Sequence, residues 1–259
     1  MCLDRQRRLA DENLIAAFDL VRRCVHESRG ATQRFGPVVA IRTGIEVGFY
    51  NPVLALGSEG SIDDVLAAVD WVESSGLPTS VHLSAGVERR IGAELLGHDF
   101  VVDPWASPVM ALERIPPLHR APPELRLRVG GAELIDDWHT AVGVSTTLRR
   151  VIGPEFMADP TVRVAVGDLD GEPVAHAAAV RSGPALGVYA VGTVEGFRRR
   201  GYGRAVTWAV IDAGVASWQS EVAILQSSES GVPVYESMGF AEVDRIFAFD
   251  RATVSAGPS

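Results

Sequence analysis

The stretch EGFRRRGYGRAV, residues 195–206, places four arginines and three glycines immediately before apolar residues at helical spacing. Glycine allows a tight bend and a close approach of the main chain to a ligand. A helix that begins here presents unpaired N–H groups at the positive end of its dipole, and arginines add charge-assisted hydrogen bonds. The segment therefore predicts an anion site, and the anion that suits it is a pyrophosphate.

A dinucleotide-binding fold is the rival interpretation, because GYGRAV begins like G-x-G-x-x-G. Val206 stands where the third glycine belongs, and Glu221 precedes the next strand rather than ending it. The motif also lies deep in the chain, after antiparallel strands. These departures exclude the dinucleotide fold.

The elements that must position the loop follow from apolar periodicity. A helix is predicted over 204–218, where Val206, Ala209, Val210 and Ala213 follow helical spacing. Upstream we expect a helix, a loop region through Pro160 and then strands, with a hairpin turn at Asp170-Gly171. The elements predicted around the loop are a helix over 132–144, strands over 162–168, 173–180 and 186–194, and, after the 204–218 helix, a strand over 221–226, a helix over 232–239 and a strand over 240–250.

The first half of the chain ends in the same order of elements. A helix over 61–76, a strand over 79–84 and a helix over 87–97 match those around the arginine loop, and each half closes its last helix with a glycine. Paired prolines interrupt residues 113–128, where neither a helix nor a central strand can form. We therefore expect an α+β protein of two tandem domains, each a mixed, mainly antiparallel sheet flanked by helices. The predicted division is a domain over 1–117, a linker over 118–124, a catalytic domain over 125–254 and a tail over 255–259.

Composition limits the partners. A net charge of −9, from 24 basic and 33 acidic residues, argues against nucleic acid. Cys2 and Cys24 have no metal-ligand spacing, so we expect no metal and no disulfide framework. No apolar stretch long enough for a signal peptide or membrane span occurs, so we expect a cytoplasmic protein without a membrane partner. The oligomeric state stays open.

Two motifs together resemble the GCN5-related N-acetyltransferase (GNAT) superfamily. RRRGYG fits the R/Q-x-x-G-x-G/A acetyl-CoA signature, and LQSSESGVPVYESMGF, residues 225–240, is similar to the later strand-helix-strand segment. The resemblance covers roughly residues 125–252. The layout of two GNAT-like halves with an active second half resembles several actinobacterial acetyltransferases.

The resemblance implies a cofactor, acetyl-CoA, and roles for individual residues. Tyr235 matches the general acid that protonates the departing thiolate, and Gly192 is where the family's strand bulge would open a slot for the thioester. The backbone N–H near Thr193 would polarise the thioester carbonyl. Ser228 stands where the family often has asparagine. The full set of implied cofactor contacts is Val191, Gly192, Thr193, Arg198, Arg199, Arg200, Gly201, Tyr202, Gly203, Arg204 and Ser228.

The proton acceptor is not identified by the resemblance. At pH 7 an alkyl ammonium ion with a pKa of about 10.4 is neutral about once in 2,500 molecules, which costs about 4.6 kcal/mol. Some family members use a glutamate where this chain has Ala223. The candidates here are Glu195, His176 and Glu229, with a water relay as the alternative. A lone strand histidine such as His176 is more often a packing residue than a base.

The first half lacks the chemistry of the second. Ala93 stands where Tyr235 does, and SEGSIDD replaces the arginine loop with Glu59, Asp63 and Asp64, which repel a pyrophosphate. We therefore expect the first half to be a degenerate domain that forms one side of the acceptor cleft.

The expected function is transfer of an acetyl group from acetyl-CoA to a primary amine by direct attack. The acceptor is a small-molecule or peptide amine whose identity the sequence does not give. The alternative is a non-catalytic acyl-CoA-binding sensor or regulatory module that kept the loop without turnover. A carrier or structural protein without any cofactor is the third interpretation.

Overall fold

A computed structural model describes residues 2–116, 120–143 and 145–252, so the expected tail over 255–259 lies outside the described residues. The chain forms two compact units. The larger unit comprises Met1–Val25 and Pro108–Val243, and the smaller comprises His26–Ser107 and Asp244–Ser259. Within the described ranges, no helix combines the length and apolar character needed to cross a membrane.

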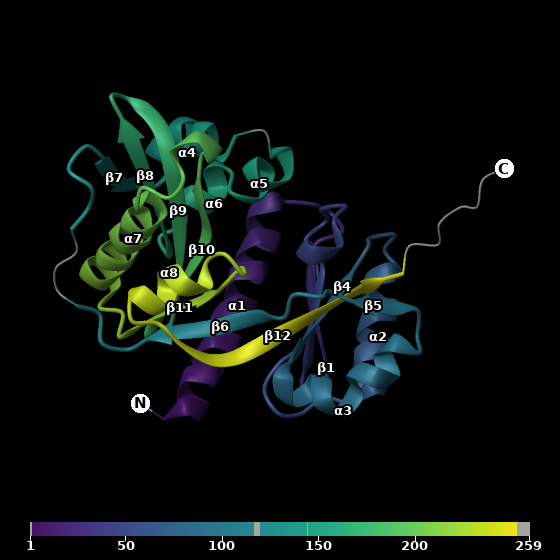
Figure 1. Ribbon diagram of the computed structural model, residues 1–259. Coiled ribbons are helices and arrows are strands. Elements are labelled where there is room, and N and C mark those ends of the chain that lie inside the picture. The colour runs from purple at the N-terminus through teal and green to yellow at the C-terminus, as the bar shows by residue number, and fades with distance from the viewer. Residues whose placement is uncertain (1, 117–119, 144, 253–259) are drawn as a thin grey trace. The chain divides into compact units, whose positions relative to one another are not determined.

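The larger unit is built on a mainly antiparallel sheet that carries the arginine loop (Figure 1). Its strand order is β6-β11-β10-β9-β8-β7, and only the neighbours β10 and β11 are parallel. The strands are β6 (Ser107–Leu112), β7 (Arg126–Gly130), β8 (Val162–Leu169), β9 (Glu172–Ser182), β10 (Ala185–Thr193) and β11 (Val222–Gln226). The turn between β8 and β9 has positive φ at Asp170 and Gly171, as the Asp-Gly pair predicts.

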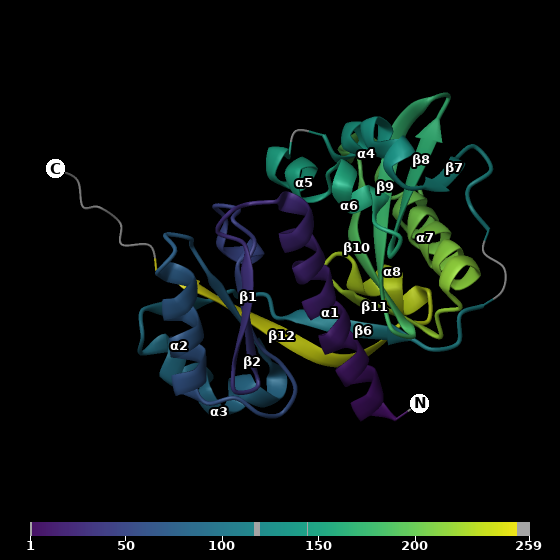
Figure 2. The same cartoon turned by 180° about the vertical axis from the view of Figure 1, so that it is seen from behind.

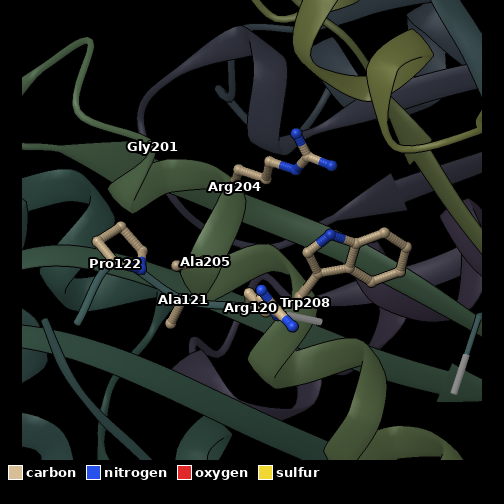
Figure 3. Close-up of a pocket in the computed structure, with 7 residues that line it drawn as sticks. All are labelled: Arg120, Ala121, Pro122, Gly201, Arg204, Ala205 and Trp208. Carbon is tan, nitrogen blue, oxygen red and sulfur yellow. The ribbon is translucent and has the colours of Figure 1, made fainter. Parts of the chain in front are cut away.

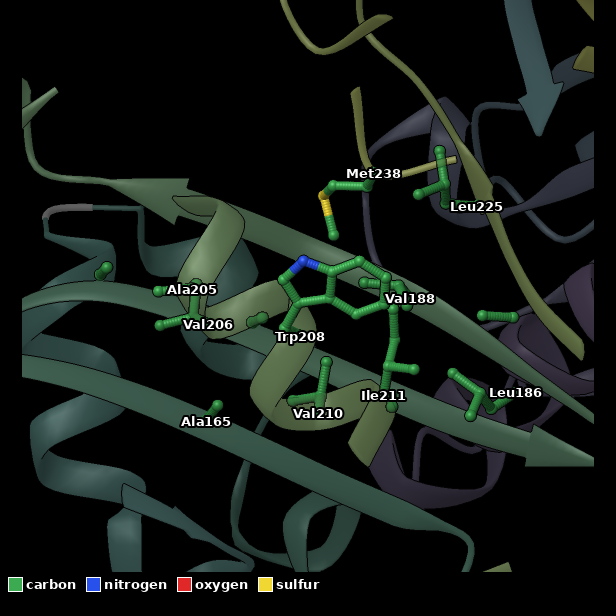
Figure 4. Packing of buried hydrophobic residues seen from close by; sticks show 14 of the residues in the cluster. Ala165, Leu186, Val188, Ala205, Val206, Trp208, Val210, Ile211, Leu225 and Met238 are labelled. Carbon is green, nitrogen blue, oxygen red and sulfur yellow. The ribbon is translucent and has the colours of Figure 1, made fainter. Parts of the chain in front are cut away.

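Helices cover both faces of this sheet. α7 (Tyr202–Trp218) lies on one face, and α1 (Leu3–Val25) and α4 (Ile135–Val142) lie on the other (Figures 1 and 2). α7 buries Trp208, Val210 and Ile211 against the sheet and Met238, which places the core directly behind the loop (Figure 4). The remaining helices of this unit are α5 (Thr146–Val151), α6 (Pro154–Ala158), α8 (Val232–Ser237) and the short 3-10 turns η2 (Ala132–Leu134) and η3 (Glu195–Phe197).

The smaller unit is also built on a mainly antiparallel sheet. Its strand order is β1-β2-β3-β4-β12, with β5 also paired to β12, and only β3 and β4 are parallel. Its elements are β1 (Ala31–Phe35), β2 (Val38–Arg42), η1 (Gly48–Tyr50), β3 (Pro52–Ala55), α2 (Ile62–Glu73), β4 (Ser80–Ser84), α3 (Ala85–Leu96), β5 (Phe100–Val102) and most of β12 (Ala241–Arg251). The predicted fold, two tandem α+β domains with mainly antiparallel sheets, is confirmed.

The units do not divide at the proline-rich seam. β6 follows the last helix of the first half, yet it pairs with β11 in the larger unit. β12 follows the last helix of the second half, yet its residues Ile246–Asp250 pair with β4 in the smaller unit. The halves thus exchange their last long strands, and α1 also belongs to the larger unit. The predicted ranges 1–117 and 125–254 therefore do not coincide with the units, because the apolar pattern of a strand does not indicate which of two similar sheets it joins.

Two segments differ from the sequence-based expectation. Residues 145–160 were expected as a loop, but Ser145 caps α5 by accepting a hydrogen bond from the Leu148 amide, and Pro154 opens α6. α1 was not predicted, although Ala10, Leu14, Ala17 and Val21 follow helical spacing and are buried.

Candidate active site

The arginine loop joins β10 to α7 at the surface of the larger unit. β10 ends at Thr193, and Gly201 adopts a left-handed conformation with φ of 83° immediately before α7 begins at Tyr202. The side chains of Arg198, Arg199 and Arg200 are exposed. Glycine at 201 makes this sharp entry into the helix possible without a steric penalty.

The main-chain amides of residues 199–204 make no hydrogen bond with any other residue that the structure describes. No side chain caps the start of α7, and the first helical bond runs from the Ala205 amide to the Gly201 carbonyl. Within the same described ranges, Arg198, Arg199, Arg200 and Arg204 form no ion pair with a carboxylate. Unpaired amides, a helix N-terminus and uncompensated arginines together form an anion site.

A cavity of about 550 Å³ opens beside this loop and brings together most of the predicted cofactor contacts. Ten of the eleven line it together with Tyr235; the exception is Arg200, whose guanidinium donates to the Gly196 carbonyl at 3.4 Å. Residues that sequence reasoning missed also line it: Thr207, Ser230, Gly231, Pro233, Val234 and Ser237. Thr207 lies one turn after Gly203 on the loop side of α7, and this spacing could have identified it.

β10 and β11 separate beside this cavity. Their parallel pairing covers only Ala185–Gly187 opposite Val222–Ile224, while β10 continues to Thr193. The register of β10 against β9 shifts between Tyr189 and Gly192, and Ala190 has a φ of 48°. A bulge is therefore present, but it lies at Ala190 and Val191, and Gly192 is the first residue paired again. Gly192 and Thr193 pair with β9, but on the side of β11 the edge at residues 191–193 has no strand partner among the described residues and lines the cavity.

Tyr235 lies on α8 at the opposite side of the cavity. Its ring packs edge-on against Phe240 with centroids 5.8 Å apart, and its hydroxyl lies near the Thr207 side chain. The Thr207 hydroxyl donates to the Gly203 carbonyl at 2.8 Å. Burial raises the pKa of Tyr235, and the contact with Thr207 opposes that shift. The phenol therefore stays protonated at neutral pH and can serve as an acid.

None of the three candidate bases lines the cavity. Glu195 and Glu229 are exposed. His176 is 7% exposed, and burial lowers its pKa to about 4, although its hydrogen bond to the Ala190 carbonyl opposes the shift. The structure therefore does not bring a protein base to the cavity from among these residues.

A second hollow of about 350 Å³ adjoins the start of α7. Arg204 and Trp208 project from α7 on one side of it, and Arg120, Ala121 and Pro122 approach from the segment before β7 (Figure 3). Gly201 and Arg204 line both cavities. The positive charge of the loop therefore extends along the outer side of the helix.

The corresponding place in the smaller unit offers no such site. β3 and β4 are paired along the whole length of β3, from Pro52 to Ala55, so no slot opens between them. The start of α2 is capped from within the chain, because the Ser61 hydroxyl accepts from the Asp64 amide at 3.1 Å and Asp64 caps Ser61 in return. These features support the interpretation of a degenerate repeat.

Comparison with known proteins agrees with this geometry. Residues 135–254 match the family model described as an acetyltransferase (GNAT) domain. A search of curated proteins finds no match. Among solved structures, a GCN5-related N-acetyltransferase from Kribbella flavida is 19% identical, with a TM-score of 0.72 and 95% of each chain covered. A GCN5-related N-acetyltransferase-like protein from Streptococcus suis is 14% identical, with a TM-score of 0.57 and coverage of 94% of this chain and 99% of that one.

A tandem GNAT protein from the clavulanic acid biosynthesis pathway is 11% identical, with a TM-score of 0.55 and coverage of 86% of this chain and 79% of that one. At these identities the likeness concerns the fold. The fold is that of GNAT proteins in tandem arrangement. Residues 135–254 thus match the acetyltransferase (GNAT) domain family, and the chain has the fold of solved GNAT proteins.

Proposed function

We propose that this protein moves an acetyl group from acetyl-CoA to a primary amine by direct attack. The observation that carries the proposal is the continuity of one cavity from the unpaired amides and arginines of the loop, past the free edge of β10, to Tyr235. Each part of the cavity suits a different portion of acetyl-CoA. The positive loop suits the pyrophosphate, the edge of β10 suits the pantetheine arm, and Tyr235 can protonate the thiolate.

The loop would bind the pyrophosphate through the main-chain amides of residues 199–204 and the guanidinium groups around them. Val191, Gly192 and Thr193 would offer strand-edge groups to the pantetheine arm, and the amide near Thr193 would polarise the thioester carbonyl. Ser228 would contact the cofactor from the loop before α8. Gly203 lets the first turn of α7 approach the end of β10, because a Cβ there would lie 3.2 Å from the Thr193 hydroxyl oxygen.

In the reaction the amine nitrogen attacks the thioester carbon, the carbon–sulfur bond breaks, and Tyr235 gives its proton to the leaving thiolate. The ammonium form of the acceptor loses one proton before the attack and a second after it, and Tyr235 regains its proton from solvent. We assign the removal of the amine protons to a water relay, because Glu195, His176 and Glu229 all lie away from the cavity lining. No covalent enzyme intermediate is needed.

Calorimetry with acetyl-CoA tests the loop. The double variant Arg199→Glu, Arg200→Glu should abolish binding, because it places two negative charges beside the pyrophosphate. Arg126→Glu, an exposed arginine on β7, is the control and should retain affinity. Micromolar affinity in the loop variant would contradict the assignment.

Turnover tests the acid. Tyr235→Phe should lower the rate of acetyl transfer far more than it weakens acetyl-CoA binding, and an unchanged rate would remove Tyr235 from the mechanism. The absence of a protein base from the cavity lining favours one other candidate function, an acyl-CoA-binding sensor. Thiol release from acetyl-CoA over a panel of small amines and peptides separates the two, because a sensor binds without releasing thiol.

A further inference from the structure

His176 lies on β9 directly opposite Gly192 of β10, on the side of the sheet that α4 covers. Its Nδ1 is 2.7 Å from the carbonyl oxygen of Ala190. Because a carbonyl oxygen only accepts hydrogen bonds, Nδ1 carries the proton and donates it. Burial keeps the ring neutral at ordinary pH, so Nε2 holds the lone pair.

The carbonyl that His176 binds belongs to the bulge. Ala190 has a φ of 48°, which is unfavourable for any residue with a side chain, and it falls within the register shift between Tyr189 and Gly192. A residue held in such a conformation needs compensating interactions from its surroundings. The hydrogen bond from His176 supplies one at the bulged residue itself.

The imidazole is confined on both sides. Trp138 of α4, fully buried, meets it edge-on with ring centroids 4.8 Å apart, and the Trp138 indole N–H is fixed on the Ala177 carbonyl at 3.2 Å. On the other side, a Cβ at position 192 would lie 2.3 Å from Nε2, so only glycine leaves room for the ring. Gly192 is therefore required by the imidazole, and not only by the cavity that it lines.

We propose that His176 is a positioning residue that holds the β10 bulge, and thereby sets the strand edge of residues 191–193 that receives the acyl-pantetheine arm. The inference rests on the proposed function for the meaning of that edge, while the bulge and its contacts are independent of it. Removal of the amine proton is not part of this role, because His176 itself does not line the cavity and its Nε2 lies behind Gly192, which does.

Two variants separate positioning from base catalysis. In His176→Asn the side-chain NH₂ takes the place of Nδ1–H and can still donate to the Ala190 carbonyl, but the variant has no basic group. His176→Leu has neither. Positioning predicts that the Asn variant retains kcat and KM for acetyl-CoA within about threefold, whereas the Leu variant raises that KM by about tenfold, the equivalent of one hydrogen bond of about 1.4 kcal/mol. Equal loss of kcat in both variants, with acetyl-CoA affinity kept, would overturn the proposal in favour of a base.

A readout that does not need turnover keeps the test independent of the proposed function. Amide chemical shifts and hydrogen exchange at residues 190–193 should match wild type in the Asn variant and change in the Leu variant, even if acetyl-CoA does not bind. Unchanged signals in the Leu variant would refute the positioning role. If His176→Leu does not fold, Gly192→Ala displaces the same ring, and its amide shifts at residues 190–193 should change in the same way.

Discussion

The buried, neutral state of His176 makes a quantitative prediction about stability and pH. Burial lowers the pKa of His176 from 6.5 to about 4 in the folded protein. Above pH 6.5 the histidine is neutral in both the folded and the unfolded chain, so it adds no pH dependence. As the pH falls below 6.5, His176 binds a proton in the unfolded chain but stays neutral in the folded protein. The free energy of unfolding therefore decreases.

The size of the effect follows from 1.36 kcal/mol for each pKa unit. Between pH 7.5 and pH 5, wild type should lose about 2 kcal/mol of stability through this one group, rising to about 3 kcal/mol near pH 4. His176→Asn and His176→Leu carry no titrating group at this position, and every other residue is common to all three proteins. The stability of each variant relative to wild type should therefore rise by about 2 kcal/mol between pH 7.5 and pH 5.

Urea unfolding followed by tryptophan fluorescence measures the free energy of unfolding at each pH, and Trp138 contacts the imidazole directly. At pH 7.5, 6 and 5 the free energies of unfolding of the two variants should differ by the same amount. That amount is the contribution of the hydrogen bond that His176→Leu lacks. The stability of each variant relative to wild type should rise by the same amount in both. If all three proteins lost stability in parallel, His176 would not be a buried neutral group and the reasoning about the bulge would fail.

Three further substitutions test other parts of the structure. Thr207→Val removes the hydroxyl that opposes the rise in the pKa of Tyr235, so turnover should fall several-fold while calorimetric acetyl-CoA affinity stays within a factor of two. A parallel loss of both would contradict this role. Arg128→Ala leaves the Asp168 carboxylate, 3% exposed, without the partner that now lies 2.8 Å away, and should lower the urea-derived stability by about 3 kcal/mol. Asn51→Ala should lower the free energy of unfolding by about 3 kcal/mol. The Asn51 side chain accepts a hydrogen bond from the Thr43 amide and donates to the carbonyls of Ile45 and Pro78. A loss below about 1 kcal/mol would contradict this prediction.

The part of the site that could be predicted from sequence is the part built from local chemistry. Gly201 and the arginines around it act within a few residues of chain, where spacing alone fixes a turn and a helix start. The predicted loop is indeed exposed, and among the described residues its amides are unpaired. Tyr235 was placed by its distance from the Gly-Phe pair, and the structure brings it to the same cavity.

The contacts that could not be predicted join residues far apart in the chain. His176 was weighed as a base because its type allows that chemistry, but its role depends on Ala190 and Trp138, which no local spacing connects to it. The bulge was expected at Gly192 because glycine tolerates unusual backbone, yet the positive φ is at Ala190, and the glycine serves the neighbouring imidazole.

The strand exchange also changes how the smaller unit can be tested. Deleting residues 1–117 would remove not only the degenerate half but also α1 and β6 from the larger unit. Asn13 of α1 is buried, donates to the Val180 carbonyl at 3.0 Å and accepts from the Tyr189 hydroxyl at 2.6 Å. A truncated protein would therefore lose activity whether or not the smaller unit has any part in acceptor binding.

The traded strands β6 and β12 also suggest a route by which such a chain arises. β6 beside β11 and β12 beside β4 occupy equivalent places in the two sheets, so two identical copies of one half could exchange this strand, as in a domain-swapped dimer. Fusing the two genes would make that pairing permanent. From then on only one copy needs to keep its nucleotide loop, and the other is free to acquire the carboxylates now found at Glu59, Asp63 and Asp64 while still lending its partner a strand.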